Sequence, residues 1–173
     1  LKQYTDTIVS KGPGQVKRRL MDEVTLFLHK VESDPAQRNG SQEETVFKGK
    51  TVLLVDDDVR NTYALSKVLI ARGLTVLAAS NGENALKILD RKPGIDGVLM
   101  DVMMPLMDGY ETMREIRKQE RFRTLPIIAL TAKAMRDDRE KCLAAGATDY
   151  LAKPVEAEKL LSLLRVWLSG GAA

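Results

Sequence analysis

The chain has few of the residues on which disulfide frameworks and membrane spans depend. Its 173 residues include one cysteine, Cys142, and one histidine, His29. A single thiol cannot build a disulfide framework, which is typical of a reducing compartment. No apolar stretch approaches the roughly 18 residues that a membrane helix needs, and the N-terminal LKQYTDTIVSKG lacks the apolar core of a signal peptide. We therefore expect a cytoplasmic protein with no direct membrane contact.

The chain also lacks a large excess of positive or negative charge. Residues 1–48 hold eight Lys and Arg against seven Asp and Glu, and residues 49–173 hold nineteen against seventeen. The densest basic spot, residues 17–19, is followed at once by Asp22 and Glu23. Such mixing of signs is typical of solvated helix faces. We expect no nucleic-acid partner, although the pI is near 9.0.

Composition divides the chain into three parts. Residues 1–32 contain a short apolar run, a Gly-Pro-Gly break and an amphipathic helical pattern, which predict an N-terminal strand and helix. Residues 33–48 are polar with Pro, Asn and Gly, and this composition predicts a linker. Residues 49–169 then alternate between buried-strand and helical patterns, and we interpret them as one α/β domain.

The alternation within the α/β domain defines its fold class. The predicted strands cover residues 51–55, 74–79, 97–100, 127–130 and 149–152; a first helix ends at residues 72–73, and later helices cover 83–90, 110–119, 133–144 and 155–168. The side chains expected to face the sheet include Leu65, Val68, Leu69, Met113, Ile116, Leu160, Leu161, Leu164, Trp167 and Leu168. Five strands alternating with five helices imply a parallel sheet with helices on both faces. Right-handed crossovers favour the flavodoxin-like order 2-1-3-4-5.

Polar residues follow four of the predicted strands at their carboxyl ends. Asp56, Asp57 and Asp58 follow the first strand, Asp101 the third, Thr131 the fourth and Lys153 the fifth. In a parallel sheet these ends meet at one edge, where ligands of such sheets bind. Clustered carboxylates repel one another unless a cation neutralises them, and Mg²⁺ prefers such hard oxygen ligands. The sequence therefore predicts an acidic Mg²⁺ site with a hydroxyl and an ammonium group, suited to phosphoryl chemistry.

Taken singly, each of these features has a simpler explanation. The acidic triplet and Thr131 could each cap a helix, and Lys153-Pro154 could be a plain turn. It is their occurrence together at successive strand ends that favours a functional site.

The same segments resemble the receiver domains of two-component signalling. The resemblance rests on LLVDDD (53–58), LMDVMMPLMDGYE (99–111), ALTAK (129–133) and GATDYLAKP (146–154). The spacings are also similar, at 44 residues from Asp57 to Asp101, 30 to Thr131 and 22 to Lys153. The block around Asp101 is similar to those of hybrid histidine kinases, so we expect a terminal receiver, either free-standing or at the C-terminus of such a kinase.

By position, the resemblance implies a role for each matching residue. Asp101 would accept a phosphoryl group from the phosphohistidine of a kinase domain in cis or trans, in a relay that can include a histidine phosphotransfer protein. Mg²⁺ would be held by Asp56, Asp57, Asp101 and the backbone carbonyl of Met103. Lys153 would bind the phosphoryl group, and the bond from Lys153 to Pro154 is usually cis in this family. Thr131 and Tyr150 would form the conformational switch.

Two further expectations concern Met103 and Asp58. Because Met103 offers no polar side chain to orient water, we expect slow autodephosphorylation. For Asp58, which has no place in the family pattern, a helix N-cap is the favoured interpretation.

The N-terminal segment admits two interpretations. Residues 7–31 resemble the last strand and helix of a preceding receiver-like module, which would make the chain part of a larger kinase. Alternatively the helix packs on the receiver or on a second copy, which leaves open a homodimer. His29, in the sequence FLHKVE, lacks the surroundings typical of phosphorylated histidines, so we interpret it as a partly exposed helix residue.

Two rival functions remain for the α/β domain. Residues 56–60 partly match the aspartyl-nucleophile motif of haloacid-dehalogenase-type phosphatases, although Arg60 departs from it and Asp56 would then be the nucleophile. The other rival is a pseudo-receiver, a binding scaffold that is never phosphorylated. Such scaffolds usually lose a carboxylate or the lysine, and this chain retains all of them.

Overall fold

The computed structural model describes residues 44–132 and 136–169. The predicted N-terminal strand and helix, the first part of the predicted linker and Lys133 lie outside the described residues. Among the described helices, none is both long enough and apolar enough to cross a membrane.

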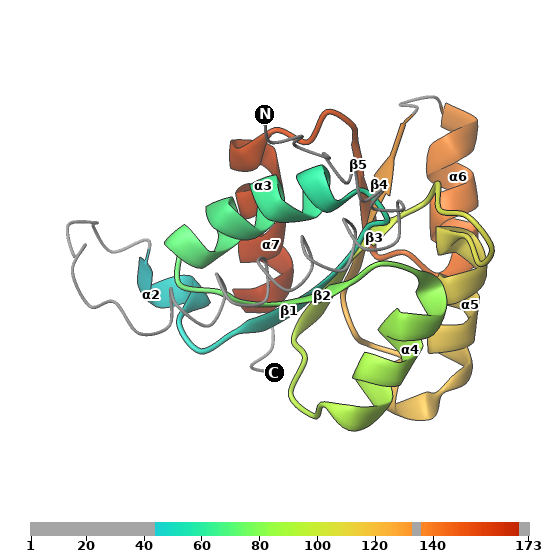
Figure 1. Ribbon diagram of the computed structural model, residues 1–173, viewed down its shortest axis with the longest axis horizontal. Coiled ribbons are helices and arrows are strands. Elements are labelled where there is room, and N and C mark those ends of the chain that lie inside the picture. Colours follow the sequence, from blue (N-terminus) through green and yellow to red (C-terminus); the bar gives the residue numbers. More distant parts are fainter. Residues whose placement is uncertain (1–43, 133–135, 170–173) are drawn as a thin grey trace, which may run out of the picture. The chain divides into compact units, whose positions relative to one another are not determined.

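The described residues form a five-stranded parallel sheet with helices on both faces (Figure 1). The strands are β1 (Thr51–Val55), β2 (Thr75–Ala79), β3 (Gly97–Asp101), β4 (Ile127–Thr131) and β5 (Asp149–Ala152). The helices are α2 (Glu44–Phe47), α3 (Val59–Ala71), α4 (Gly82–Arg91), α5 (Gly109–Lys118), α6 (Arg136–Ala145) and α7 (Ala157–Ser169), with a 3₁₀ turn η1 (Glu120–Phe122). The strand order is β2-β1-β3-β4-β5, which confirms the predicted topology.

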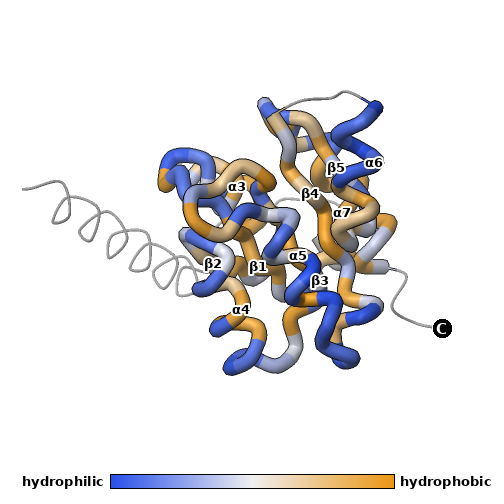
Figure 2. The backbone as a smooth tube through the Cα atoms, turned by 90° about the vertical axis from the view of Figure 1, so that its right-hand side faces the viewer, coloured by the Kyte–Doolittle hydropathy of each residue, from blue (hydrophilic) through white to orange (hydrophobic). Residues whose placement is uncertain are grey.

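Alternate side chains of the central strands enter two separate cores. Leu53, Val98 and Ile127 pack on one face with residues of α4, α5 and α6. Val52 and Leu99 point to the other face, where α3 and α7 pack. This division follows from the two-residue period of a strand, and it requires apolar residues on both sides. Figure 2 shows the result as hydrophobic central strands, whereas much of α6 is hydrophilic.

One predicted core position on a helix is wrong. Trp167 is 36% exposed, because the inner face of α7 is formed by Leu160, Leu161, Leu164 and Leu168. Its indole N–H instead donates to Asp149 Oδ2 at 3.3 Å. Val68 is half-buried and packs against the core with Leu65 and Leu69, as predicted. Thr62 and Ser66 of α3 are buried as well.

Residues 44–47 form a short helix at a place where the sequence predicted a linker. Phe47 is 1% exposed and belongs to the core on the α3 and α7 side of the sheet. A chain turn follows, in which the Lys50 N–H donates to the Phe47 carbonyl at 3.0 Å and Gly49 takes a φ of 79°. One buried aromatic residue in an otherwise polar segment is too weak a pattern to predict such docking.

Candidate functional site

The carboxyl ends of β1, β3, β4 and β5 meet at one edge of the sheet. Asp56 follows β1 directly, Asp101 ends β3, Thr131 ends β4 and Lys153 follows β5. The parallel register places Asp101 opposite Leu130 and Thr131 opposite Ala152. The four residues that the sequence analysis placed at successive strand ends therefore lie at one edge, as predicted.

Asp56 is buried, and both of its carboxylate oxygens accept hydrogen bonds. Oδ1 accepts from the Asp58 N–H at 2.8 Å, and Oδ2 accepts from Lys153 Nζ at 3.1 Å and from Asn61 Nδ2 at 3.4 Å. These donors hold the carboxylate in one orientation at the mouth of the site.

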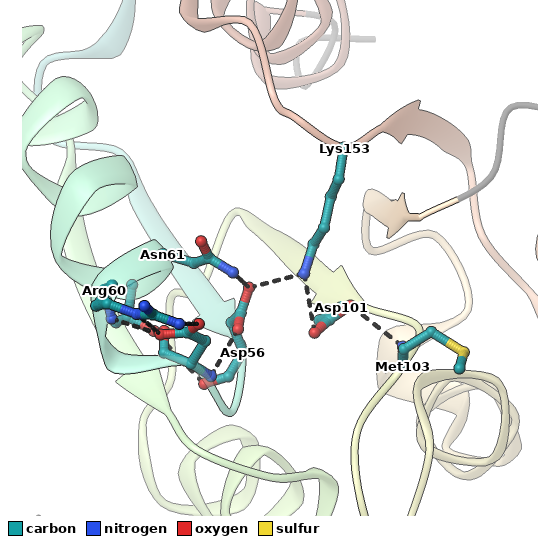
Figure 3. A network of polar contacts seen from close by, with 8 residues as sticks. Asp56, Arg60, Asn61, Asp101, Met103 and Lys153 are labelled. Atoms are coloured by element: carbon teal, nitrogen blue, oxygen red, sulfur yellow. Dashed lines mark hydrogen bonds and ion pairs between the residues drawn. The ribbon is translucent and has the colours of Figure 1, made fainter.

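Asp101 is 3% exposed, and its carboxylate contacts the same Lys153 ammonium group as that of Asp56. Lys153 Nζ lies 3.0 Å from Asp101 Oδ2, and the Met103 N–H donates to Asp101 Oδ1 at 3.1 Å (Figure 3). Burial raises the pKa of the Asp101 carboxyl, and the charge of Asp56 adds to this, whereas the contact with Lys153 opposes it. Lys153 is thus the group that favours the ionised form of Asp101.

Lys153 bridges the two buried carboxylates. Burial lowers the pKa of its ammonium group, but the hydrogen bonds and charges of Asp101 and Asp56 outweigh this, and the pKa is raised overall. The Lys153 N–H donates to the Thr131 carbonyl at 2.7 Å, and the peptide bond to Pro154 is cis, as the family pattern implies. The Lys153 side chain is therefore charged, and the Lys153 backbone is held to the end of β4.

The donor set fits a hard divalent cation. One carboxylate oxygen from each of Asp56, Asp57 and Asp101 lies within 4.8 Å of the others. Asp57 is half-buried, whereas Asp56 and Asp101 are buried. Three carboxylates beside a single ammonium leave a net negative charge, which Mg²⁺ with oxygen ligands would neutralise.

Thr131 and Tyr150 occupy neighbouring strands. Thr131 is buried, and Tyr150 is half-buried and packs against the core on the α4, α5 and α6 side. Tyr150 pairs with Ala129, two residues before Thr131 on β4.

The Asp58 side chain caps helix α3, while its backbone N–H donates to Asp56 Oδ1. Its carboxylate accepts from the Arg60 N–H at 2.9 Å, and the Arg60 guanidinium lies 2.8 Å from Oδ2. These hydrogen bonds, first from the side chain and then from the backbone of Arg60, lower the pKa of Asp58 to about 2. The capping interpretation is confirmed.

Sequence reasoning missed two residues that shape the site, Asn61 and Gly109. Asn61 donates to Asp56 from the first turn of α3, and its place five residues after Asp56 was the available signal. Gly109 starts α5 against the backbone of Asp101, where an added Cβ would lie 2.2 Å from the Asp101 carbonyl oxygen. A side chain there would displace the strand end that carries Asp101.

Comparison with known proteins agrees with this geometry. Residues 52–165 match the response regulator receiver domain family. The sensor histidine kinase GacS of Pseudomonas protegens is 36% identical over 157 residues, which is 88% of this chain and 16% of GacS. The chain therefore spans about one sixth of the length of this relative.

Solved structures show the same similarity. The receiver domain of a Pseudomonas aeruginosa sensor histidine kinase, with a magnesium ion coordinated in its active site cleft, has 42% identity and a TM-score of 0.66, covering 70% of this chain and 99% of that one. The complex of the Saccharomyces cerevisiae histidine phosphotransfer protein Ypd1 with the receiver domain of Ssk1 matches with 30% identity and a TM-score of 0.68, covering 73% of this chain and 94% of that one.

With the fold, the strand-end carboxylates and lysine, and the match over residues 52–165 in agreement, the chain belongs to the receiver domain family of two-component response regulators.

Proposed function

We propose that this receiver domain accepts a phosphoryl group on Asp101 from a phosphohistidine, in the presence of Mg²⁺. The observation that carries the proposal is the bridge from Lys153 Nζ to Asp56 and Asp101, at 3.1 and 3.0 Å, with the Asp57 carboxylate beside it. Phosphoryl transfer depends mainly on position and charge neutralisation, and this arrangement supplies both.

In the proposed step, a carboxylate oxygen of Asp101 attacks phosphorus. The new O–P bond forms as the N–P bond of the phosphohistidine breaks, and the released imidazole nitrogen takes up a proton. Lys153 keeps Asp101 ionised before transfer, which the burial of that carboxyl would otherwise oppose. After transfer its ammonium group pairs with the phosphoryl oxygens.

Asp56, Asp57, Asp101 and the Met103 backbone carbonyl are the groups that would hold Mg²⁺. An ion held there would neutralise carboxylate charge and would supply a Lewis acid for a phosphoryl oxygen. Support comes from the three convergent carboxylates and from the related P. aeruginosa receiver, which was solved with magnesium in its cleft.

A switch through Thr131 and Tyr150 completes the proposal. The Thr131 hydroxyl would bond to the new phosphoryl group, and the half-buried ring of Tyr150 would turn into the space so opened, which would shift the surface of α6, β5 and α7. The burial of Thr131 and the packing of Tyr150 against the adjacent core support this assignment.

We assign the domain to a phosphorelay in the cytoplasm, with a histidine kinase and a histidine phosphotransfer protein as partners. We also propose that the phosphoryl group is lost slowly from Asp101. Support for these partners comes from the similarity to GacS and to the receiver in the Ypd1 complex. Slow loss is expected because the Met103 side chain has no polar atom and points away from Asp101 (Figure 3).

Intact-mass measurement with acetyl phosphate and Mg²⁺ tests the function. We expect one added phosphoryl group on the parent chain and none on Asp101→Asn. Asp58→Asn is the matched control, because it removes a nearby carboxylate but keeps an N-cap residue, and it should be labelled like the parent. A folded parent chain without an adduct would favour the pseudo-receiver instead.

The phosphatase alternative makes a different demand on the same residues. It needs Asp56 rather than Asp101 as the nucleophile, although both carboxylates contact the same Lys153 ammonium group. Turnover of an aryl phosphate that disappears in Asp56→Asn and persists in Asp101→Asn would establish it.

A further inference from the structure

The loop between Asp101 and α5 exposes two large apolar side chains beside the site. Met103 is 69% exposed and Leu106 is 99% exposed. Leu106 also has a φ of 71°, a left-handed conformation that is unfavourable for a leucine. A fully exposed leucine gains no burial energy on folding and its left-handed backbone opposes folding, so local stability does not account for this residue.

The rest of the loop is firmly anchored, which keeps Leu106 in this position. Val102 and Met104 are buried in the core on the α4, α5 and α6 side. Met107 packs on the start of α4, where a Cβ added to Gly82 would lie 2.8 Å from its Sδ atom. At the end of the loop the Gly109 N–H donates to the Val102 carbonyl at 3.0 Å. The exposed leucine is therefore held between fixed points and presented outward.

Met103 lies next to the reacting group, and Leu106 follows three residues later on the same loop. The Met103 N–H bonds to Asp101 Oδ1, while the Met103 side chain turns away toward solvent (Figure 3). Because Asp101 is buried, a macromolecular donor can bring phosphorus to it only by laying its own surface over the mouth of the site. Such a surface meets the loop that carries Met103 and Leu106.

We propose that Met103 and Leu106 form an apolar rim that is covered, during transfer, by an apolar protein surface surrounding the donor's phosphohistidine. This inference rests on the proposed function and adds the chemistry of the partner's contact surface. Burial of the rim would contribute to docking affinity, whereas a small donor such as acetyl phosphate does not need it.

The proposed donor group favours a protein occupant over a membrane. A phosphohistidine is part of a protein, and it must be brought to Asp101 beside Asp56 and Asp57. A donor protein can match the rim with apolar side chains and place an imidazole at the carboxylates.

The test compares a small donor with protein donors on the full 173-residue chain. Acetyl phosphate with Mg²⁺ is the small donor; the protein donors are the kinase portion of GacS, phosphorylated with ATP, and phosphorylated Ypd1. The variant is Leu106→Asn, because asparagine tolerates the left-handed conformation and removes the apolar surface. Leu106→Met is the conservative variant, and Val166→Asn, at an equally apolar exposed position on α7, is the matched control.

We expect Leu106→Asn to take phosphoryl from acetyl phosphate within about twofold of the parent rate. The protein donor that phosphorylates the parent chain faster is used for the comparison. With this donor, the kcat/KM of Leu106→Asn should be at least tenfold lower than that of the parent chain (about 1.4 kcal/mol), mainly because KM rises. Leu106→Met should recover most of this loss, and Val166→Asn should behave as the parent. The melting temperature of Leu106→Asn should stay the same or rise.

Several results would contradict the proposal that Met103 and Leu106 contact the donor protein. Among them are an unchanged protein-donor rate in Leu106→Asn, an equal loss with both kinds of donor, and no transfer from either protein donor to a parent chain that acetyl phosphate labels. A concentration-dependent dimer that Leu106→Asn abolishes would assign the surface to a second copy. Failure of acetyl phosphate to label the parent chain would instead refute the proposed function.

Discussion

Replacing Lys153 by methionine isolates the charge that holds the site together. The Lys153 ammonium lies 3.1 Å from Asp56 Oδ2 and 3.0 Å from Asp101 Oδ2. At an effective dielectric constant of about 20, each contact is worth on the order of 5 kcal/mol, before the dehydration of the ammonium group is subtracted. Methionine is similar in length and apolar, so it leaves two buried carboxylates without their shared cation.

The expected loss in the free energy of unfolding is about 3 kcal/mol at neutral pH in EDTA. Removing one partner of a buried pair typically costs about 3 to 5 kcal/mol, and the lower end applies because part of the lysine side chain remains in contact with solvent. Mg²⁺ should restore more stability to Lys153→Met than to the parent chain, because the variant has one positive charge fewer at the carboxylates.

Urea unfolding followed by far-UV circular dichroism measures this loss. Lys118→Met is the matched control, since Lys118 pairs with Glu115 at 2.5 Å on the exposed side of α5, and its loss should be below about 0.5 kcal/mol. Adding Asp101→Asn to Lys153→Met should recover part of the stability, because one buried charge disappears. A loss below about 1 kcal/mol for Lys153→Met would refute the reasoning, since that is the size expected of a solvated pair.

Three more substitutions test other parts of the structure. Phe47→Ala should lower the free energy of unfolding by about 3 to 5 kcal/mol, as truncation of a buried phenylalanine does elsewhere; a loss below about 1 kcal/mol in urea unfolding would show that α2 does not dock. Asp101→Asn should be more stable than the parent chain at neutral pH, and its advantage should shrink as the pH is lowered. The reason is that burial raises the folded pKa of Asp101 above 3.8, so ionisation weakens the fold as the pH rises through that pKa. Thermal unfolding at a series of pH values measures this, and a pH-independent difference would contradict it. Gly109→Ala should lower stability by about 1 to 3 kcal/mol and slow labelling by acetyl phosphate, since its Cβ would lie 2.7 Å from Val102 Cα; normal labelling of a stable variant would contradict the assigned contact.

The strand order and the strand-end positions were predictable from local pattern. Continuous apolar runs marked β1, β3 and β4 as strands buried on both faces, and right-handed crossovers left few arrangements of five parallel strands. Asp101 and Lys153 then had to lie at the same edge. These conclusions depend only on the period of the backbone and on the rule that parallel strands end together.

Other features depend on contacts between distant residues, and only the tertiary structure decided them. Trp167 faces outward because four leucines form the inner face of α7, and Phe47 is buried because the core beside α7 accepts it. The apolar character of these two residues was evident from the sequence, but the surface that each would meet was not. The same holds for Leu106, whose left-handed backbone follows from buried anchors on either side of it. The sequence by itself determined the topology and the chemistry at the sheet edge, because both follow from backbone periodicity and residue type. The placement of single side chains was decided by packing, because it depends on neighbours that lie far away along the chain.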